Sequence, residues 1–206
     1  PQKGNVYINN IDIYENPEAI KGLIGYVSQD DILIEDLTVY DNLYYNARMS
    51  FNNLPLQIIQ DRIDTILKTL GLYNIKNIKV GSPMNKKISG GQRKRLNIAL
   101  ELIREPAILI LDEPTNYLDE EHITWLTRYL QEYENSFVLV SHDIPFINNT
   151  CNVIYHMENG ELNRYKGNYD EFVRFNEIKK RQEEQAYDKQ VEERKKLEDF
   201  VARNKA

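Results

Sequence analysis

The chain has 206 residues, of which 41% are apolar, enough to bury the core of one domain with an appendage or of two small domains. Its formal net charge of −6 argues against a generally basic surface that coats nucleic acid, although a local basic patch is compatible with it. The single cysteine, Cys151, excludes an internal disulfide, and no apolar run approaches the roughly 18 residues of a membrane span. These features predict a globular, cytoplasmic protein without a membrane segment.

Short strands joined by turns are predicted over the first 30 residues. Val6-Tyr7-Ile8 precedes a turn signal at Asn9-Asn10, and Gly25-Tyr26-Val27 forms a further strand that Gln29 follows. Over residues 38–71 the apolar side chains recur at steps of three and four residues. This spacing predicts helices, with a glycine at the end of the last one as the stop.

A glycine-rich helix start, Ser89-Gly90-Gly91-Gln92, comes next. Ser89 is well placed to cap a helix that continues until Pro106 stops it. Such a start offers unhindered backbone N–H groups and a hydroxyl to an anion, and the helix dipole helps. A Ser-Gly-Gly sequence by itself is more often only a capped turn. The basic residues that follow it here, Arg93-Lys94-Arg95, and the strand after the helix favour the anion-binding interpretation.

The residues Ile108 to Leu111 form a short apolar run, which predicts a parallel strand covered on both faces. Asp112-Glu113 ends this strand, and parallel sheets bind ligands beyond the carboxyl ends of their strands. We therefore expect Asp112 to hold a magnesium ion, directly or through water. Glu113 is expected to orient or deprotonate an attacking water.

A helix of roughly 120–133 and a second apolar strand, Phe137-Val138-Leu139-Val140, continue the alternation of strands and helices that predicts a parallel sheet. His142 follows this strand, a position that suits contact with a γ-phosphate or the attacking water. Gln29 follows its own strand and suits contact with magnesium or water. The other two histidines are interpreted as surface or capping residues.

The C-terminal part differs in composition. A last strand, Val153 to Met157, turns at Glu158-Asn159-Gly160, and residues 169–206 contain neither Gly nor Pro. Counted from Glu161, the tail has twelve Lys and Arg against eleven Asp and Glu. This predicts a long charged helix or a helical hairpin. An interrupted apolar stripe favours an antiparallel pair of helices over a long coiled coil.

Together these motifs resemble those of the ATP-binding cassette (ABC) ATPases, over about residues 1–165. Five elements match in order: Gln29 at the Q-loop, Ser89-Gly90-Gly91-Gln92 at the signature motif, Asp112-Glu113 at Walker B, Leu118-Asp119 at the D-loop and His142 at the switch histidine. The resemblance implies an α/β fold, a P-loop NTPase-like cassette with a helical insertion at about 38–105. Residues 166–206 would form a charged helical linker.

The resemblance also implies the ligands and roles. ATP and Mg²⁺ would be bound where this cassette meets a second cassette, from the same or another chain, and Glu113 and His142 would be catalytic. Asp112 and Gln29 would hold the metal. The residues that would contact nucleotide are Gln29, Ser89, Gly90, Gly91, Gln92 and Asp119.

One major element of the family is missing from the sequence. The phosphate-binding Walker A loop, G-x-x-x-x-G-K-[ST], does not occur in these residues. The chain begins at Pro1 and enters directly on a strand-like segment. We therefore expect the loop to lie upstream of this sequence, and we expect the chain by itself not to turn over ATP.

The subfamily resemblance divides along the chain. Residues 25–31 and the block Ile88 to Glu101 resemble the cassettes of G-type (White-family) transporters. Residues 112–119 and 165–169, together with the charged tail, resemble ABC-F proteins, ribosome-associated ATPases without transmembrane domains. In that family a similar linker joins two cassettes and reaches toward tRNA. The pattern indicates a hybrid with its junction near the Walker B strand.

Three functions remain open at this point. The first is an ABC-F-like ATPase for translation or ribosome protection, with ribosome or tRNA contacts through 166–206. The second is the motor of a G-type exporter, bound to a transmembrane domain. The third is a non-catalytic fragment that supplies a signature motif in trans. Lys179-Lys180-Arg181 and Arg194-Lys195-Lys196 could meet RNA phosphates, and the alternative for both is a solvated helix face.

Overall fold

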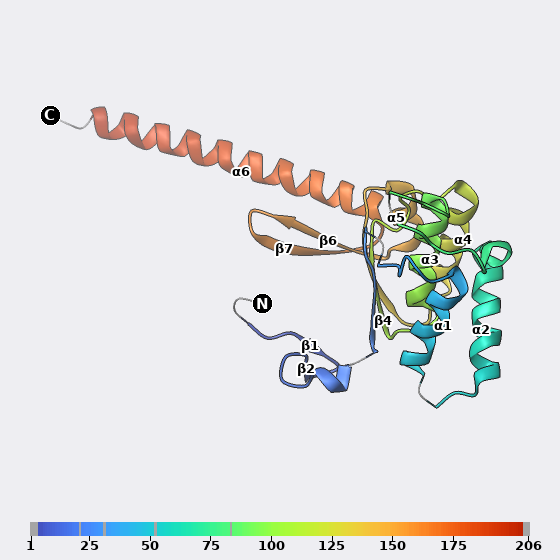
Figure 1. The fold of residues 1–206 in the computed structure, drawn as a ribbon. Coiled ribbons are helices and arrows are strands. Elements are labelled where there is room, and N and C mark those ends of the chain that lie inside the picture. Colours follow the sequence, from blue (N-terminus) through green and yellow to red (C-terminus); the bar gives the residue numbers. More distant parts are fainter. Residues whose placement is uncertain (1–3, 21, 31, 52, 83, 204–206) are drawn as a thin grey trace. The chain divides into compact units, whose positions relative to one another are not determined.

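A computed structural model describes residues 4–20, 22–30, 32–51, 53–82 and 84–203. The chain divides into two compact units, Pro1–Phe146 and Ile147–Ala206, and each is considered by itself. Figure 1 shows the order of the elements along the chain.

The first unit begins with a short antiparallel hairpin of β1 (Tyr7–Ile8) and β2 (Ile11–Asp12), followed by a single-turn helix, η1 (Pro17–Ile20). The two turn residues, Asn9 and Asn10, have φ angles of 50° and 63°. Asparagine tolerates this left-handed region better than most residues do, and a two-residue turn of this kind matches the twist of the strands. The predicted turn is confirmed.

Three parallel strands form the sheet that carries the site, in the order β3 (Ile24–Val27), β4 (Ile108–Asp112) and β5 (Ser136–Val140). The helices between them are α1 (Val39–Ser50), α2 (Leu56–Thr69), the short η2 (Tyr73–Ile75), α3 (Gly90–Leu102) and α4 (Glu120–Gln131). α5 (Ile144–Thr150) follows β5. The predicted α/β architecture with a parallel sheet is confirmed.

Only one face of this sheet is fully covered. Leu109 and Leu111 are completely buried and pack with apolar residues of α3, α4 and α5. The side chains on the opposite face are more open, with Tyr26, Val138 and Val140 between 48% and 54% exposed. The prediction that the β4 strand is covered on both faces is therefore wrong in this structure, because the buried apolar cluster with α3, α4 and α5 lies against one face of the sheet.

A second apolar cluster joins α1, α2 and α3, and its fully buried side chains include Leu43, Ile63 and Leu96. α2 ends at the predicted glycine stop. Gly71 has a φ of 63°, and the backbone N–H of Leu72 donates to the carbonyl of Leu67 at 2.8 Å. This is the usual way in which a left-handed residue closes a helix C-terminus.

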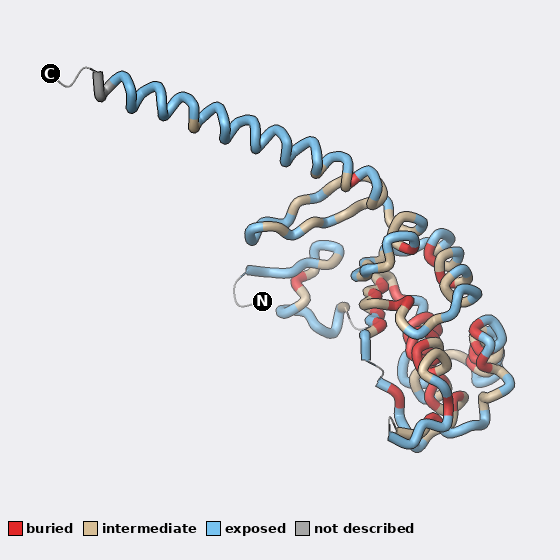
Figure 2. Tube along the Cα trace, turned by 90° about the horizontal axis from the view of Figure 1, so that it is seen from above, coloured by how far each residue is buried: buried red, intermediate tan, exposed pale blue. Residues whose placement is uncertain are grey.

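The second unit contains a hairpin and one helix. β6 (Val153–Glu158) pairs with β7 (Glu161–Lys166) across the predicted Asn159-Gly160 turn. α6 (Tyr169–Arg203) is one continuous helix of 35 residues, so the predicted alternative of a helical hairpin within this segment is wrong. Phe172, near its start, packs against the rings of His156 and Tyr165. Beyond it, α6 is exposed along nearly its whole length (Figure 2).

None of the helices, among the residues that the structure describes, is long and apolar enough to cross a membrane.

Candidate active site

The carboxyl ends of the three parallel strands carry the predicted catalytic and metal-binding residues. Gln29 comes just after β3, Asp112-Glu113 lies at the end of β4, and His142 comes just after β5. Parallel strands end at the same edge of a sheet, so this arrangement follows from the strand order.

Glu113 and His142 are in direct contact. The Nδ1 atom of His142 lies 2.8 Å from Oε2 of Glu113, and the same oxygen accepts longer bonds, of 3.4 Å each, from the Ser141 hydroxyl and the His142 N–H. Glu113 has a φ of 45°, and its N–H donates to the Val140 carbonyl at 2.8 Å. This left-handed turn at the end of β4 fixes the residue against β5. Strained backbone of this kind is often found at functional sites.

The two side chains of the pair differ in exposure, and their hydrogen bond sets the electrostatics of His142. The Glu113 side chain is 18% exposed, whereas that of His142 is 76% exposed. The hydrogen bond to the Glu113 carboxylate raises the pKa of His142 above its ordinary value. The carboxylate can therefore orient the imidazole through Nδ1, which leaves the other ring nitrogen on the solvent side for a ligand or a water.

Asp112 is half-buried at the end of β4, and Oδ2 accepts a hydrogen bond of 3.2 Å from the Tyr26 hydroxyl. This bond raises the pKa of the phenol. Gln29 is exposed at the same edge. In the described part of the chain, no three His, Cys, Asp or Glu side chains gather as a metal-binding group. One carboxylate and one amide oxygen suit Mg²⁺, which keeps several waters and takes its other ligands from phosphates.

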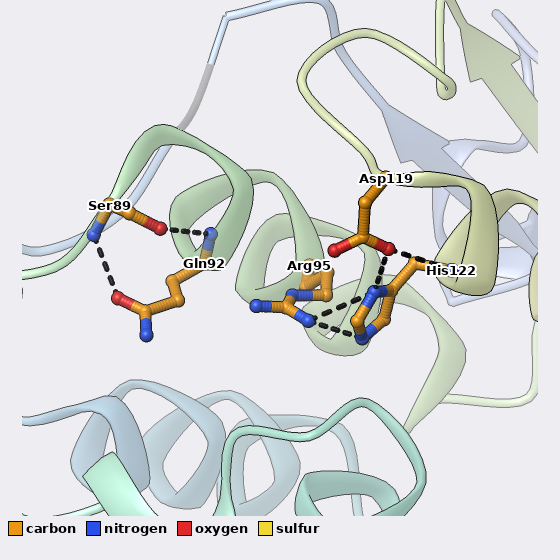
Figure 3. A network of polar contacts seen from close by, with 5 residues as sticks. All are labelled: Ser89, Gln92, Arg95, Asp119 and His122. Atoms are coloured by element: carbon orange, nitrogen blue, oxygen red, sulfur yellow. Dashed lines mark hydrogen bonds and ion pairs between the residues drawn. The ribbon is translucent and has the colours of Figure 1, made fainter.

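The predicted signature residues form the start of α3. The Ser89 hydroxyl accepts from the N–H of Gln92 at 3.2 Å, and the Gln92 side chain accepts from the N–H of Ser89 at 2.8 Å (Figure 3). This reciprocal pair is a capping box, which confirms the predicted N-cap. In this conformation the oxygen of Gln92 stabilises the helix start.

Gly91 is required by its surroundings. A Cβ atom at this position would lie 2.8 Å from the carbonyl oxygen of Tyr117, in the segment between β4 and α4, whereas at Gly90 the nearest atom would be 4.0 Å away. The glycine therefore allows the start of α3 to approach the segment that ends at Asp119.

Asp119 caps α4 and is part of a polar network with α3 (Figure 3). Its carboxylate accepts from the N–H of His122 at 3.0 Å and also contacts Nδ1 of that ring. The Arg95 guanidinium contacts the same imidazole, 3.1 Å from Nδ1. The bond from the His122 side chain lowers the pKa of Asp119. The carboxylate is thus held as an anion between the two helices.

A polar pocket of about 380 Å³ lies beside this network. Its lining residues come from the α3 start and from the segment that leads into α4: Ser89, Gly91, Arg95, Tyr117, Leu118, Asp119 and His122. The predicted nucleotide-contacting residues Ser89, Gly91 and Asp119 therefore share one cavity. Neither Glu113 nor His142 is among the residues that line this cavity.

Sequence reasoning missed two residues of the strand-end site and one of the pocket. Tyr26 contacts Asp112 because the two strands are neighbours, and Lys94 reaches the same edge from α3. His122 is predicted to be a surface or capping residue, whereas in the structure its imidazole lies between Arg95 of α3 and Asp119. The sequence does contain a signal for His122. It follows the N-cap Asp119 by three residues, and a helix brings residue i+3 back toward an N-cap at residue i.

Comparison with known proteins gave consistent matches. Two sequence models of protein families, both described as ABC transporter, match residues 1–116 and 155–206. The uncharacterized ABC transporter ATP-binding protein YfmM of Bacillus subtilis is 45% identical over 194 residues, which cover 93% of this chain and 35% of that protein.

Relatives in two subfamilies are also similar to the chain. ABC transporter F family member 4 of Dictyostelium discoideum is 30% identical, over 87% of this chain and 16% of that protein. ABC transporter G family member 28 of Arabidopsis thaliana is 40% identical, over 57% of this chain and 11% of that protein. The chain thus spans about a third or less of the length of these relatives.

A solved structure of a dimeric ATP-binding cassette in a post-hydrolysis state, bound to ADP and Pi, resembles this fold with a TM-score of 0.66. The sequences are 28% identical, and the match covers 81% of this chain and 74% of the other.

Proposed function

Because this chain belongs to the ABC transporter family of ATP-binding cassettes, we propose that it is the cassette of an ABC-F-like, ribosome-associated ATPase. The whole protein would act in translation or ribosome protection, binding and hydrolysing ATP between two cassettes. The single observation that carries the catalytic part is the 2.8 Å contact between His142 and Glu113 at the carboxyl edge of the sheet.

The proposed roles follow from that geometry. Glu113 would orient and deprotonate the attacking water, and His142, held by Glu113, would contact the γ-phosphate with its free ring nitrogen. Asp112 and Gln29 would hold Mg²⁺, which neutralises charge that develops on the phosphates. Tyr26 would fix the rotamer of Asp112 through the hydroxyl bond.

The pocket beside α3 would serve the nucleotide of a second cassette. Ser89 and the backbone N–H groups of Gly90 and Gly91 lie at a helix N-terminus, which attracts anions. Asp119, which lines this pocket, and Gln92, which caps the start of α3, would also contact that nucleotide. The similarity to a dimeric cassette supports the pairing of two cassettes.

The C-terminal segment favours the ABC-F alternative. A family model described as ABC transporter matches residues 155–206, which include the whole of α6. An exposed, charged helix of 35 residues is suited to bridging between bodies. The motor of a G-type exporter remains the second candidate, because an ABC transporter G family member is 40% identical over 57% of the chain.

The two candidate functions predict different results in one experiment, co-sedimentation with ribosomes. A tandem protein of two such cassettes joined by α6 should co-sediment with ribosomes in ATP, and the triple change of Lys179, Lys180 and Arg181 to Glu should weaken this association. No ribosome association at low salt would favour the exporter motor. Association that charge reversal does not affect would remove these three residues from the interface.

The chain by itself provides a further test. Because its sequence contains no phosphate-binding loop, we expect the 206-residue chain not to turn over ATP. Charge-assisted hydrogen bonds to phosphate contribute about 1.5–3 kcal/mol each, so their loss weakens nucleotide binding by roughly a thousandfold or more. Saturable, magnesium-dependent hydrolysis by the purified chain would contradict this expectation, provided that Glu113→Gln abolishes it.

A further inference from the structure

α3 carries a stripe of buried polar side chains. Lys94, Asn97 and Glu101 are only 4%, 1% and 4% exposed. Their spacing of three and four residues puts them on one face of the helix. Charged side chains, and amides such as that of Asn97, are rarely buried to this extent without a hydrogen-bond partner, so each of the three requires an explanation.

All three side chains bind the end of the neighbouring strand β3, against which α3 packs. Lys94 Nζ donates to the Ser28 carbonyl at 3.1 Å, and Asn97 Nδ2 donates to the same oxygen at 3.3 Å. Glu101 accepts from the backbone N–H of Tyr26 at 3.1 Å. Backbone groups at the end of β3 are therefore bound by a helix.

Lys94 makes one contact that the other two do not. Its Nζ atom also lies 3.4 Å from the backbone carbonyl oxygen of Asp112, at the end of β4. One ammonium group thus bridges the residue just after β3 and the last residue of the adjacent parallel strand β4. Gln29 follows the first of these carbonyls, and Asp112 contributes the second.

The surroundings of Lys94 suit a buried cation. Burial lowers the pKa of its ammonium, and the carboxylates of Asp112, Glu113 and Asp30 act in the opposite direction. The two carbonyl oxygens supply hydrogen-bond acceptors at the same time. A hydrophobic residue of similar length could fill the same space, but it would remove the hydrogen bonds that the Ser28 and Asp112 carbonyls accept. The lysine is therefore needed for its donor group and not only for its size.

We propose that Lys94 is a positioning residue for the proposed ATP hydrolysis, whose ammonium ties the Ser28 and Asp112 carbonyls to the helix that begins at Ser89. The Lys94 bridge would thereby connect the proposed metal ligands, Gln29 and Asp112, to the start of α3, which would contact the nucleotide of a second cassette. The role in hydrolysis rests on the proposed function, whereas the structural bridge does not.

The bridge is tested first in the 206-residue chain by backbone hydrogen exchange. Lys94→Met should speed exchange in peptides 24–30 and 108–114 by roughly tenfold or more, because two charge-assisted hydrogen bonds are lost. Arg93→Met is the matched control. Arg93 has the same 4% exposure on the same helix, but it donates to the carbonyls of Val80 and Gly81. Its loss should speed exchange around residues 78–82 instead.

Three outcomes decide the structural claim. Faster exchange at both strand ends in Lys94→Met, with protection restored in Lys94→Arg, supports it. No local change, or the same changes in Lys94→Met and Arg93→Met, overturns it. If Lys94→Met does not fold, Lys94→Gln carries the same comparison, since it removes the charge and shortens the side chain while keeping a donor.

The role in hydrolysis is tested in a version of the cassette preceded by a phosphate-binding loop. There Lys94→Met should lower kcat/KM for Mg-ATP by roughly tenfold or more, and kcat should account for part of this loss. The reason is that small displacements of catalytic groups at the ends of β3 and β4 slow the reaction strongly. Arg93→Met leaves the carbonyls of both strand ends bound by Lys94 and should lower these constants less. Equal losses in the two variants would overturn the positioning role. An unsubstituted cassette that hydrolyses no ATP would instead refute the proposed function, and the exchange result would still stand.

Discussion

Replacing Glu113 with glutamine tests the proposed catalytic role of Glu113 and His142 most directly. The substitution keeps the size of the side chain, but an amide cannot take a proton from water. In a cassette preceded by a phosphate-binding loop, we expect kcat to fall by roughly 10²–10⁴-fold, the range for removal of a general base. ATP binding should persist, because the substitution leaves the proposed metal ligand Asp112 unchanged. Binding weakened as much as turnover would mean that Glu113 is a ligand-binding residue.

The same substitution has a second effect that needs no turnover. The Glu113 carboxylate accepts from His142 at 2.8 Å and raises the pKa of that imidazole. In Glu113→Gln the pKa of His142 should fall toward its ordinary value, and NMR titration can follow it because the chain has only three histidines. An unchanged pKa of His142 would refute the contact.

The sign of the pH effect on stability follows from this shift. A histidine whose pKa is raised by folding stabilises the folded state fully below its unfolded pKa of about 6.5, and this contribution disappears as the pH rises through the folded pKa. The stability of the unsubstituted chain relative to Glu113→Gln should therefore be greater at about pH 6 than at about pH 8.5. Denaturant unfolding at the two pH values measures the difference. A larger difference at the higher pH would contradict the assignment.

Two further predictions concern packing, with Tm and denaturant unfolding as the measurements. Gly91→Ala should cost about 1–3 kcal/mol, because its Cβ would lie 2.8 Å from the Tyr117 carbonyl, whereas the matched Gly90→Ala should change stability by less than about 0.5 kcal/mol. Leu111→Ala, on the covered face of the sheet, should cost about 2–5 kcal/mol, while Val138→Ala on the open face should cost less than about 1 kcal/mol. Equal costs within either pair would contradict the packing described.

The parts of the site that sequence could predict depend on short-range rules. Strand and helix periodicity placed the apolar runs, and the common edge of parallel strands then brought Glu113 and His142 together. The cap at Ser89 follows from residue preference alone. Each of these inferences needs only a segment of the chain and one rule about its neighbours.

The parts that sequence could not predict depend on which partners a helix meets. Arg93, Lys94 and Glu101 are charged, so composition places them on the surface, yet each is 4% exposed. Their burial is possible because the backbone satisfies their hydrogen bonds. Arg93 and Lys94 donate to the carbonyls of Gly81 and Ser28, and Glu101 accepts from the N–H of Tyr26. The coverage of β4 was overestimated for a similar reason, since an apolar run does not reveal how many faces are packed.

The length of α6 also follows from a local cause. Residues 169–203 contain no Gly or Pro to end the helix, and its charges form pairs along the surface. Lys179 lies 3.8 Å from Glu183, and Arg194 lies 2.9 Å from Glu198, both at the favourable i,i+4 spacing. These features favour a helix over residues 169–203, although the apolar side chains Ile178 and Leu197 are more than half exposed.

These surface pairs decide how the ribosome proposal is best tested. Exposed pairs contribute only about 0.2–1 kcal/mol, so Lys179 can exchange Glu183 for an RNA phosphate at little cost. The change of Lys179 to Glu in the charge-reversed variant would place two glutamates at i,i+4 and weaken the helix itself, so that variant needs a neutral variant as its control. A triple change of Lys179, Lys180 and Arg181 to Gln avoids this repulsion. The helical content of the whole protein, measured by circular dichroism, should therefore stay unchanged. If all three contact phosphates, the slope of log K against log salt should become less steep by about 2–3. An unchanged slope would show that the three residues form a solvated face.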